Sequence, residues 1–152
     1  MALGGDPDDI RDEARRLRRV AASIESEAAT VSRGQGVHWH GAAGDRYRER
    51  LARHARAIRD GAGEAGDAAS ELQRLADALE ERQAAIRRAM NFVGDLIDSA
   101  RRTINSMAGE ALDALSDAER AAHDQAQRLL SSTRHHPSPG DPAWLDLARK
   151  LG

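Results

Sequence analysis

Apolar residues in the first part of the chain recur in alternating steps of four and three. They are Ile10, Ala14, Leu17, Ala21, Ile24, Ala28 and Val31. This heptad spacing places them along one face of a helix that packs against a partner. Asp6 and Pro7 suit the N-cap and the first helical position. The pattern predicts a helix from about Pro7 to Arg33.

A second segment repeats the same rhythm from Gly44 onward. Its apolar-face positions are Tyr47, Leu51, His54, Ile58, Gly61, Ala65, Ala68, Leu72, Leu75 and Leu79. If the two segments fold back on each other about residues 37–41, one register pairs every layer. Ile24 then meets Leu51, and Leu17 meets Ile58. Residues 1–90 are therefore predicted to form an antiparallel helical hairpin with heptad packing. Its seam is expected to contain Ile10, Leu17, Ile24, Tyr47, Leu51 and Ile58.

The elbow of this hairpin carries a Trp-x-Gly sequence, Trp39-His40-Gly41. Gly34, Gly36 and Gly41 allow the backbone conformations that helix ends require. Trp39 is one of two tryptophans in a chain that is 3% aromatic. A large ring where two helix ends converge is expected to plug the closed end of the hairpin. Trp39 and Gly41 are the candidate elbow motif.

The predicted register leaves a row of apolar residues without a partner. At ~1.5 Å per residue the first helix is about 40 Å long, and it ends opposite roughly Ala68. The row beyond that point consists of Leu72, Leu75, Leu79 and Ile86. Such a row calls for another helix, either from this chain or from a second subunit. We expect it to be a partner-binding surface, and self-association is the favoured use.

The remaining chain predicts further helices. Residues 91–131 continue the apolar periodicity, with a break expected between Asn91 and Gly94 and a capping box at Ser116-Asp-Ala-Glu119. Residues 132–142 are rich in Pro, Ser and Gly, which is typical of a linker. Residues 143–152 predict a short amphipathic helix that contains Trp144. The predicted fold class is all-α, four-helix-bundle-like, with a hairpin extended by C-terminal helices.

Composition limits the possible functions. Of the 152 residues 40% are hydrophobic, and many of these are alanine, which suits thin seams between helices better than a thick core. The formal net charge is −2, so any attraction to anions must come from a local patch. The start of the chain does not resemble a general secretory signal peptide, and no apolar run reaches the ~18 residues of a membrane span. We expect a protein that is soluble in the cytoplasm, with no stable membrane insertion.

Candidate chemistry is sparse. His38 and His40 flank Trp39 but have no Cys, Asp or Glu neighbour to complete a metal site, and His135-His136 is a weaker candidate. No phosphate-binding glycine loop, nucleophile elbow or paired-carboxylate signature occurs. The sequence therefore predicts a protein that is not an enzyme, with no cofactor, no metal and no small-molecule substrate.

Charge is segregated along the second segment. Arginines crowd the half nearest the elbow, from Arg46 to Arg59, and acids dominate from Asp60 to Glu81. A basic face can contact phosphates, but aromatic residues are not interleaved with it, so nucleic acid is not the expected partner. A solvated face that orients a partner through charge is the favoured interpretation. A nucleic-acid-binding helical protein and an intracellular helical adaptor remain as alternatives.

The elbow and its flanks resemble the WXG-motif (ESX-like) proteins of type VII secretion. The resemblance rests on Trp39-His40-Gly41, on the following Ala-Ala-Gly-Asp-Arg-Tyr47 stretch and on the long helix before them. Gly5-Asp6-Pro7-Asp8 is also similar to the start of actinobacterial type VII secretion-signal domains. The resemblance covers about residues 5–90.

The resemblance implies a hairpin that associates with itself or with a related WXG-type protein into a four-helix bundle. It also implies export to the cell envelope or the medium by the type VII machinery, in the folded state and without enzymatic activity. One departure is that Tyr47 is followed four residues later by Leu51, and not by the acid of a Tyr-x-x-x-Asp/Glu export signal. The helices beyond Ile86 exceed a minimal hairpin, which suits the targeting part of a longer toxin.

Overall fold

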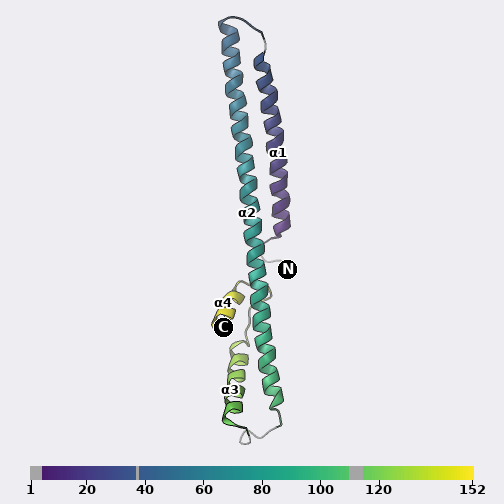
Figure 1. Ribbon diagram of the computed structural model, residues 1–152, viewed down its shortest axis with the longest axis vertical. Coiled ribbons are helices and arrows are strands. Elements are labelled where there is room, and N and C mark those ends of the chain that lie inside the picture. Colours follow the sequence, from purple (N-terminus) through teal and green to yellow (C-terminus); the bar gives the residue numbers. More distant parts are fainter. Residues whose placement is uncertain (1–4, 37, 110–114) are drawn as a thin grey trace. The chain divides into compact units, whose positions relative to one another are not determined.

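The computed structural model describes residues 5–36, 38–109 and 115–152. Its regular elements are α1 (Pro7–Arg33), the 3-10 turn η1 (Gly34–Gly36), α2 (Ala42–Ser106), α3 (Asp117–Ser132) and α4 (Ala143–Leu151) (Figure 1). No strand occurs in these ranges, which confirms the predicted all-α class. The chain divides into two compact units: the hairpin up to Glu80, and the segment from Glu81 to Gly152.

Two helix starts follow the capping signals in the sequence. The Asp6 side chain accepts a hydrogen bond from the Asp8 backbone N–H at 2.9 Å, with Pro7 at the start of α1. At α3, the Ser116 hydroxyl accepts from the Glu119 N–H at 3.4 Å, and the Glu119 carboxylate accepts from the Ser116 N–H at 2.8 Å. These bonds satisfy N–H groups that a helix start leaves unpaired. The predicted bounds of α1 and the predicted capping box are confirmed.

In the hairpin, α1 lies alongside the first part of α2 (Figure 1). The helices are antiparallel, because Arg11 near the start of α1 binds Asp77, whereas Glu25 further along binds Arg59. Among the described residues of the hairpin, the buried hydrophobic ones are alanines: Ala14, Ala28, Ala55, Ala62, Ala69 and Ala76. On α2 they recur at every seventh position, so one stripe of methyl groups faces α1. The larger seam residues lie beside this stripe and are half-buried.

The predicted register between the two helices is wrong. It places Ile10 opposite Ala65, but Arg11 binds Asp77 at 2.9 Å and also contacts Glu80. At the other end, a Cβ on Gly34 would lie 3.2 Å from Leu51 Cδ1. These α1 residues therefore face parts of α2 that lie roughly one and a half to two heptads further along than predicted. A heptad pattern matches itself after every shift of seven, so apolar spacing alone does not select the register.

The shifted register changes the role expected for the leucine row. Because α1 reaches Glu80, Leu72 and Leu79 lie half-buried in the hairpin, where the prediction left them without cover. Leu75 remains 55% exposed. Ile86 belongs to the second unit and is buried there. The row is thus not one continuous exposed surface, and only Leu75 retains the exposure that partner binding needs.

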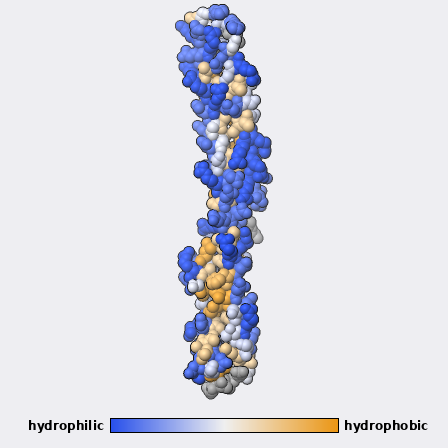
Figure 2. Space-filling view, viewed as in Figure 1, coloured by the Kyte–Doolittle hydropathy of each residue, from blue (hydrophilic) through white to orange (hydrophobic). Residues whose placement is uncertain are grey.

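The second unit has a thicker core than the hairpin. Ile86, Ala89 and Val93 of α2 form a buried cluster with Trp144 of α4. Partly buried residues around this cluster are Met90, Ile97, Leu145, Leu147, Ala148 and Leu151. Figure 2 shows apolar residues gathered over α4, whereas the visible face of the hairpin is mostly hydrophilic.

The expected helix break between Asn91 and Gly94 is absent, since α2 continues to Ser106. Val93 is fully buried in the cluster with Trp144, so packing holds this stretch in the helix. A single glycine weakens a helix by only about 1 kcal/mol, which such burial offsets.

Candidate functional site

The elbow is closed by backbone contacts at two glycines. Gly41 has φ +98°, a conformation that L side chains rarely adopt, and its carbonyl accepts the Asp45 N–H at 3.1 Å. Gly44 is buried, and a Cβ there would lie 2.1 Å from the carbonyl oxygen of Trp39. The backbone of Trp39 therefore lies directly on the first turn of α2. Gly41 supplies the turn, and Gly44 supplies the room for this contact.

Arg48 fixes the same carbonyl from the next turn of α2. Its Nη1 donates to the Trp39 oxygen at 2.8 Å, and its Nη2 binds the Asp45 carboxylate. Sequence reasoning missed this role of Arg48 and the steric role of Gly44. Gly44 follows Gly41 by three residues, and Arg48 follows Gly44 by four. This spacing places the residues on one face of a helix, so the sequence contains a signal for their joint role.

The ring of Trp39 does not plug the hairpin, contrary to prediction. It is 52% exposed and packs edge-on against Tyr47, with ring centroids 6.0 Å apart and an interplanar angle of 60°. Tyr47 is itself 42% exposed. The shifted register explains this exposure, because the first turns of α2 extend past the end of α1 (Figure 1).

Five of the six predicted seam residues are partly covered. Ile10, Leu17, Ile24, Leu51 and Ile58 are all half-buried. Tyr47 points outward, because the buried positions of α2 are Ala55, Ala62, Ala69 and Ala76 and not the residues that precede each of them. For half of the positions predicted to face α1, the residue that is buried is therefore the next one along the chain. A stripe of Tyr47, His54, Gly61, Ala68 and Leu75 stays beside the seam.

An ionic cluster joins the two helices at the open end of the hairpin. Arg11 donates to Asp8 at 3.1 Å, to Asp77 at 2.9 Å and to Glu80. The hydrogen bonds to Glu80 and Asp77 raise the pKa of Arg11, which stays charged at every ordinary pH. The hydrogen bond from Arg11, with a smaller one from Gln73, lowers the pKa of Asp77 below its ordinary 3.8. This cluster favours the observed register over neighbouring heptad registers.

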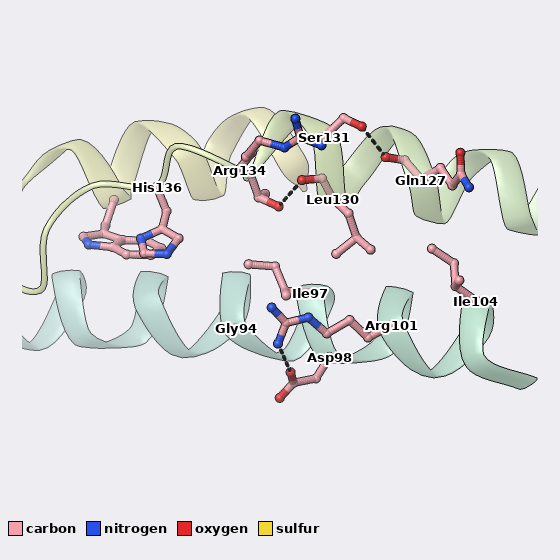
Figure 3. Close-up of a pocket in the computed structure, with 12 residues that line it drawn as sticks. Gly94, Ile97, Asp98, Arg101, Ile104, Gln127, Leu130, Ser131, Arg134 and His136 are labelled. Carbon is pink, nitrogen blue, oxygen red and sulfur yellow. Dashed lines mark hydrogen bonds and ion pairs between the residues drawn. The ribbon is translucent and has the colours of Figure 1, made fainter.

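The second unit contains a groove between the end of α2 and α3 (Figure 3). Its volume is about 800 Å³, and Ile97, Ile104 and Leu130 form its apolar part. At one end the His136 ring stacks on Trp144, with centroids 5.6 Å apart. The Trp144 Nε1 donates to the Ser138 carbonyl at 2.8 Å. These contacts hold the linker against α4.

The described ranges 5–36, 38–109 and 115–152 contain no group of three or more His, Cys, Asp or Glu residues placed to hold a metal ion. His38 and His40 lie exposed at the elbow. No helix in the same ranges is long and apolar enough to cross a membrane.

The geometry is that of an all-α protein built on an antiparallel hairpin, with an aromatic pair exposed at its elbow. Residues 2–93 match the family described as "Putative T7SS secretion signal domain". The match spans more than half of the chain and includes α1, the elbow and much of α2. The chain belongs to this type VII secretion signal family. No curated protein and no solved structure matches it.

Proposed function

We propose that this protein is a non-enzymatic substrate or targeting domain of type VII secretion, and that its hairpin is the recognised element. The observation that carries the proposal is the family match over residues 2–93, which coincides with α1, the elbow and the adjoining part of α2. The family connects the chain with the type VII machinery. Export to the cell envelope or the medium follows from that connection.

In this proposal the elbow serves recognition as a WXG-type motif. Gly44 and Arg48 hold the Trp39 backbone on α2, and the Trp39 ring packs against Tyr47. A rigid exposed aromatic residue loses little conformational entropy on binding, and such residues are common anchors in protein interfaces. The elbow is therefore suited to a docking role.

The proposal includes association through the hairpin, with a second copy or a related WXG-type protein. Its support is the stripe beside the seam, where Leu75 is 55% exposed and Tyr47 is 42% exposed. Small residues at Gly61 and Ala68 between them would let a partner helix approach closely. Sedimentation at micromolar concentration tests this part. A Leu75→Asp chain that becomes monomeric and stays helical is the expected result.

Export of a tagged chain tests the proposal as a whole. The chain is expressed in a host with an active type VII system and in the same host without the secretion ATPase. We expect the tag in the culture medium or cell envelope only when the ATPase is present. Trp39→Ala should abolish export while the chain still accumulates in the cell. Export that is equal in the two hosts would refute the assignment.

A further inference from the structure

The elbow end of the hairpin carries a concentrated positive charge around its exposed aromatic pair. Arginines there are Arg33, Arg46, Arg48, Arg50, Arg53, Arg56 and Arg59, whereas the acids between residues 33 and 59 are Asp45 and Glu49. Arg48 is held by Asp45 and the Trp39 carbonyl, and Arg59 by Glu25 and Ser32. The hairpin is acidic further along α2, from Asp60 to Glu81. The two ends of the hairpin therefore have opposite electrostatic character.

Arg46, Arg50 and Arg53 are exposed and follow a four-then-three spacing on α2. This spacing places them on one helical face, on the side of α2 away from the alanine stripe. No ion pair to a carboxylate is found for them among the described residues. Tyr47 adjoins this face, and Trp39 packs against Tyr47 at 6.0 Å. We call Trp39, Arg46, Tyr47, Arg50 and Arg53 the elbow patch.

We propose that the elbow patch docks this protein onto an anionic lipid bilayer surface. Tryptophan and tyrosine rings have an apolar body and a polar edge, and they favour the depth of the lipid headgroups. Guanidinium groups bind phosphate with two parallel hydrogen bonds and are attracted by the negative potential of anionic lipid. The elbow patch combines both features on one rigid tip.

The charge distribution also fixes how the protein meets the membrane. The acids from Asp60 to Glu81 are repelled by the surface that attracts the arginines. Contact is therefore made by the elbow, with the acidic part of the hairpin held away. A nucleic-acid surface is less suited, because the two aromatic residues lie together at the tip and are not spaced along the basic face to stack successive bases.

Vesicle binding by the purified full chain tests this inference without any secretion machinery, so its failure is distinguishable from failure of the export proposal. We expect cosedimentation with vesicles of phosphatidylcholine and phosphatidylglycerol, little with phosphatidylcholine alone, and release by high salt. Arg46→Gln/Arg50→Gln/Arg53→Gln should bind roughly 100-fold more weakly, from about fivefold per arginine. Trp39→Ala should weaken binding further while preserving its salt dependence.

A matched control separates the position of the charges from their number. Arg87, Arg88 and Arg102 are exposed arginines of the second unit, and replacing all three by Gln changes the net charge equally. This variant should bind anionic vesicles as the natural sequence does. Equal loss in both triple variants would overturn the elbow patch as the docking site.

Two other outcomes would also overturn the inference. One is no binding to anionic vesicles at low salt. The other is tighter binding to polyglutamate or to duplex DNA than to vesicles, which would assign the elbow patch to an acidic protein or to nucleic acid. The fluorescence of Trp39 in a Trp144→Phe background supplies a direct readout. A blue shift on adding anionic vesicles is expected, and an unchanged spectrum alongside cosedimentation would contradict insertion of the ring.

Discussion

At the residue scale, Gly44 determines how the elbow closes. The Trp39 carbonyl lies 2.1 Å from the position that a Cβ at residue 44 would take, and this neighbour is backbone. Arg48 holds the same oxygen at 2.8 Å. A larger side chain at residue 44 would therefore force the Trp39 carbonyl, and with it the loop that joins the two helices, to move.

Gly44→Ala should lower the free energy of unfolding by roughly 1–3 kcal/mol, the usual cost of overpacking a tight site. Gly63→Ala is a suitable control, because Gly63 lies within α2 with nothing within 4 Å of its Cβ position. That control should gain up to about 1 kcal/mol from the helix propensity of alanine. Urea denaturation followed by circular dichroism measures both. A neutral Gly44→Ala would contradict the described elbow.

Trp39→Ala should cost little stability, since the ring is 52% exposed. A loss below about 1 kcal/mol is expected, compared with ~3–5 kcal/mol for removing a buried Trp side chain. Thermal denaturation is the measurement. A loss in the larger range would show that the ring is covered in solution, for example by a second subunit, and the loss would then depend on protein concentration.

Asp77 gives the hairpin a specific response to acid. Its pKa is lowered in the folded protein by the hydrogen bond from Arg11. Its contribution to stability is therefore complete above its ordinary pKa of 3.8 and is lost as the pH falls through the lower folded value. Asp77→Asn should destabilise the hairpin at pH 7 and show a smaller further loss below pH 4. Denaturation midpoints across this range test it, and identical pH profiles would contradict the pairing.

At the element scale, the hairpin register is the feature to verify. Arg59 donates a hydrogen bond to the Ser32 hydroxyl at 2.9 Å, whereas the heptad pattern predicts a contact between Leu17 and Ile58. The chain has no cysteine, so a pair of cysteines introduced by mutation can be cross-linked without competing natural thiols. Ser32→Cys/Arg59→Cys should cross-link within one chain with a short thiol reagent, and Leu17→Cys/Ile58→Cys should not. The reverse outcome would restore the register expected from the sequence.

Some features of these elements are predictable from the sequence, and others are not. The bounds of α1 and the capping box at Ser116 follow from local signals, since caps act within a few residues. The buried face of α1 was also predictable from its spacing. The register was not, because heptads repeat and the deciding contacts between Arg11, Asp77 and Glu80 join residues far apart in sequence. Continuation of α2 past Gly94 depends on burial against α4, which only the folded chain reveals.

At the scale of the whole molecule, the two units differ in how they are stabilised. The hairpin buries alanines, whereas the second unit buries Ile86, Val93 and Trp144 around α4. Trp144 is only 7% exposed, and it also binds the linker through the Ser138 carbonyl. Removing the Trp144 side chain should therefore lower the stability of the second unit more than that of the hairpin.

Trp144→Ala should destabilise the second unit by roughly 3–5 kcal/mol, as expected for a large buried aromatic residue. Amide hydrogen exchange should accelerate in α4 and in the α2 segment around Val93. Protection in α1 should change little, because α1 belongs to the other unit. Equal loss of protection in α1 would show that the two units unfold as one.

The alanine seam has a thermodynamic consequence. Unfolding raises the heat capacity in proportion to the apolar surface that becomes exposed. Ala14, Ala28, Ala62 and Ala76 each expose less such surface than a leucine in the same layer would. The heat capacity of the hairpin should therefore rise less per residue on unfolding than that of an ordinary globular domain. Its stability curve is correspondingly shallow, so its free energy of unfolding varies weakly with temperature on either side of the maximum.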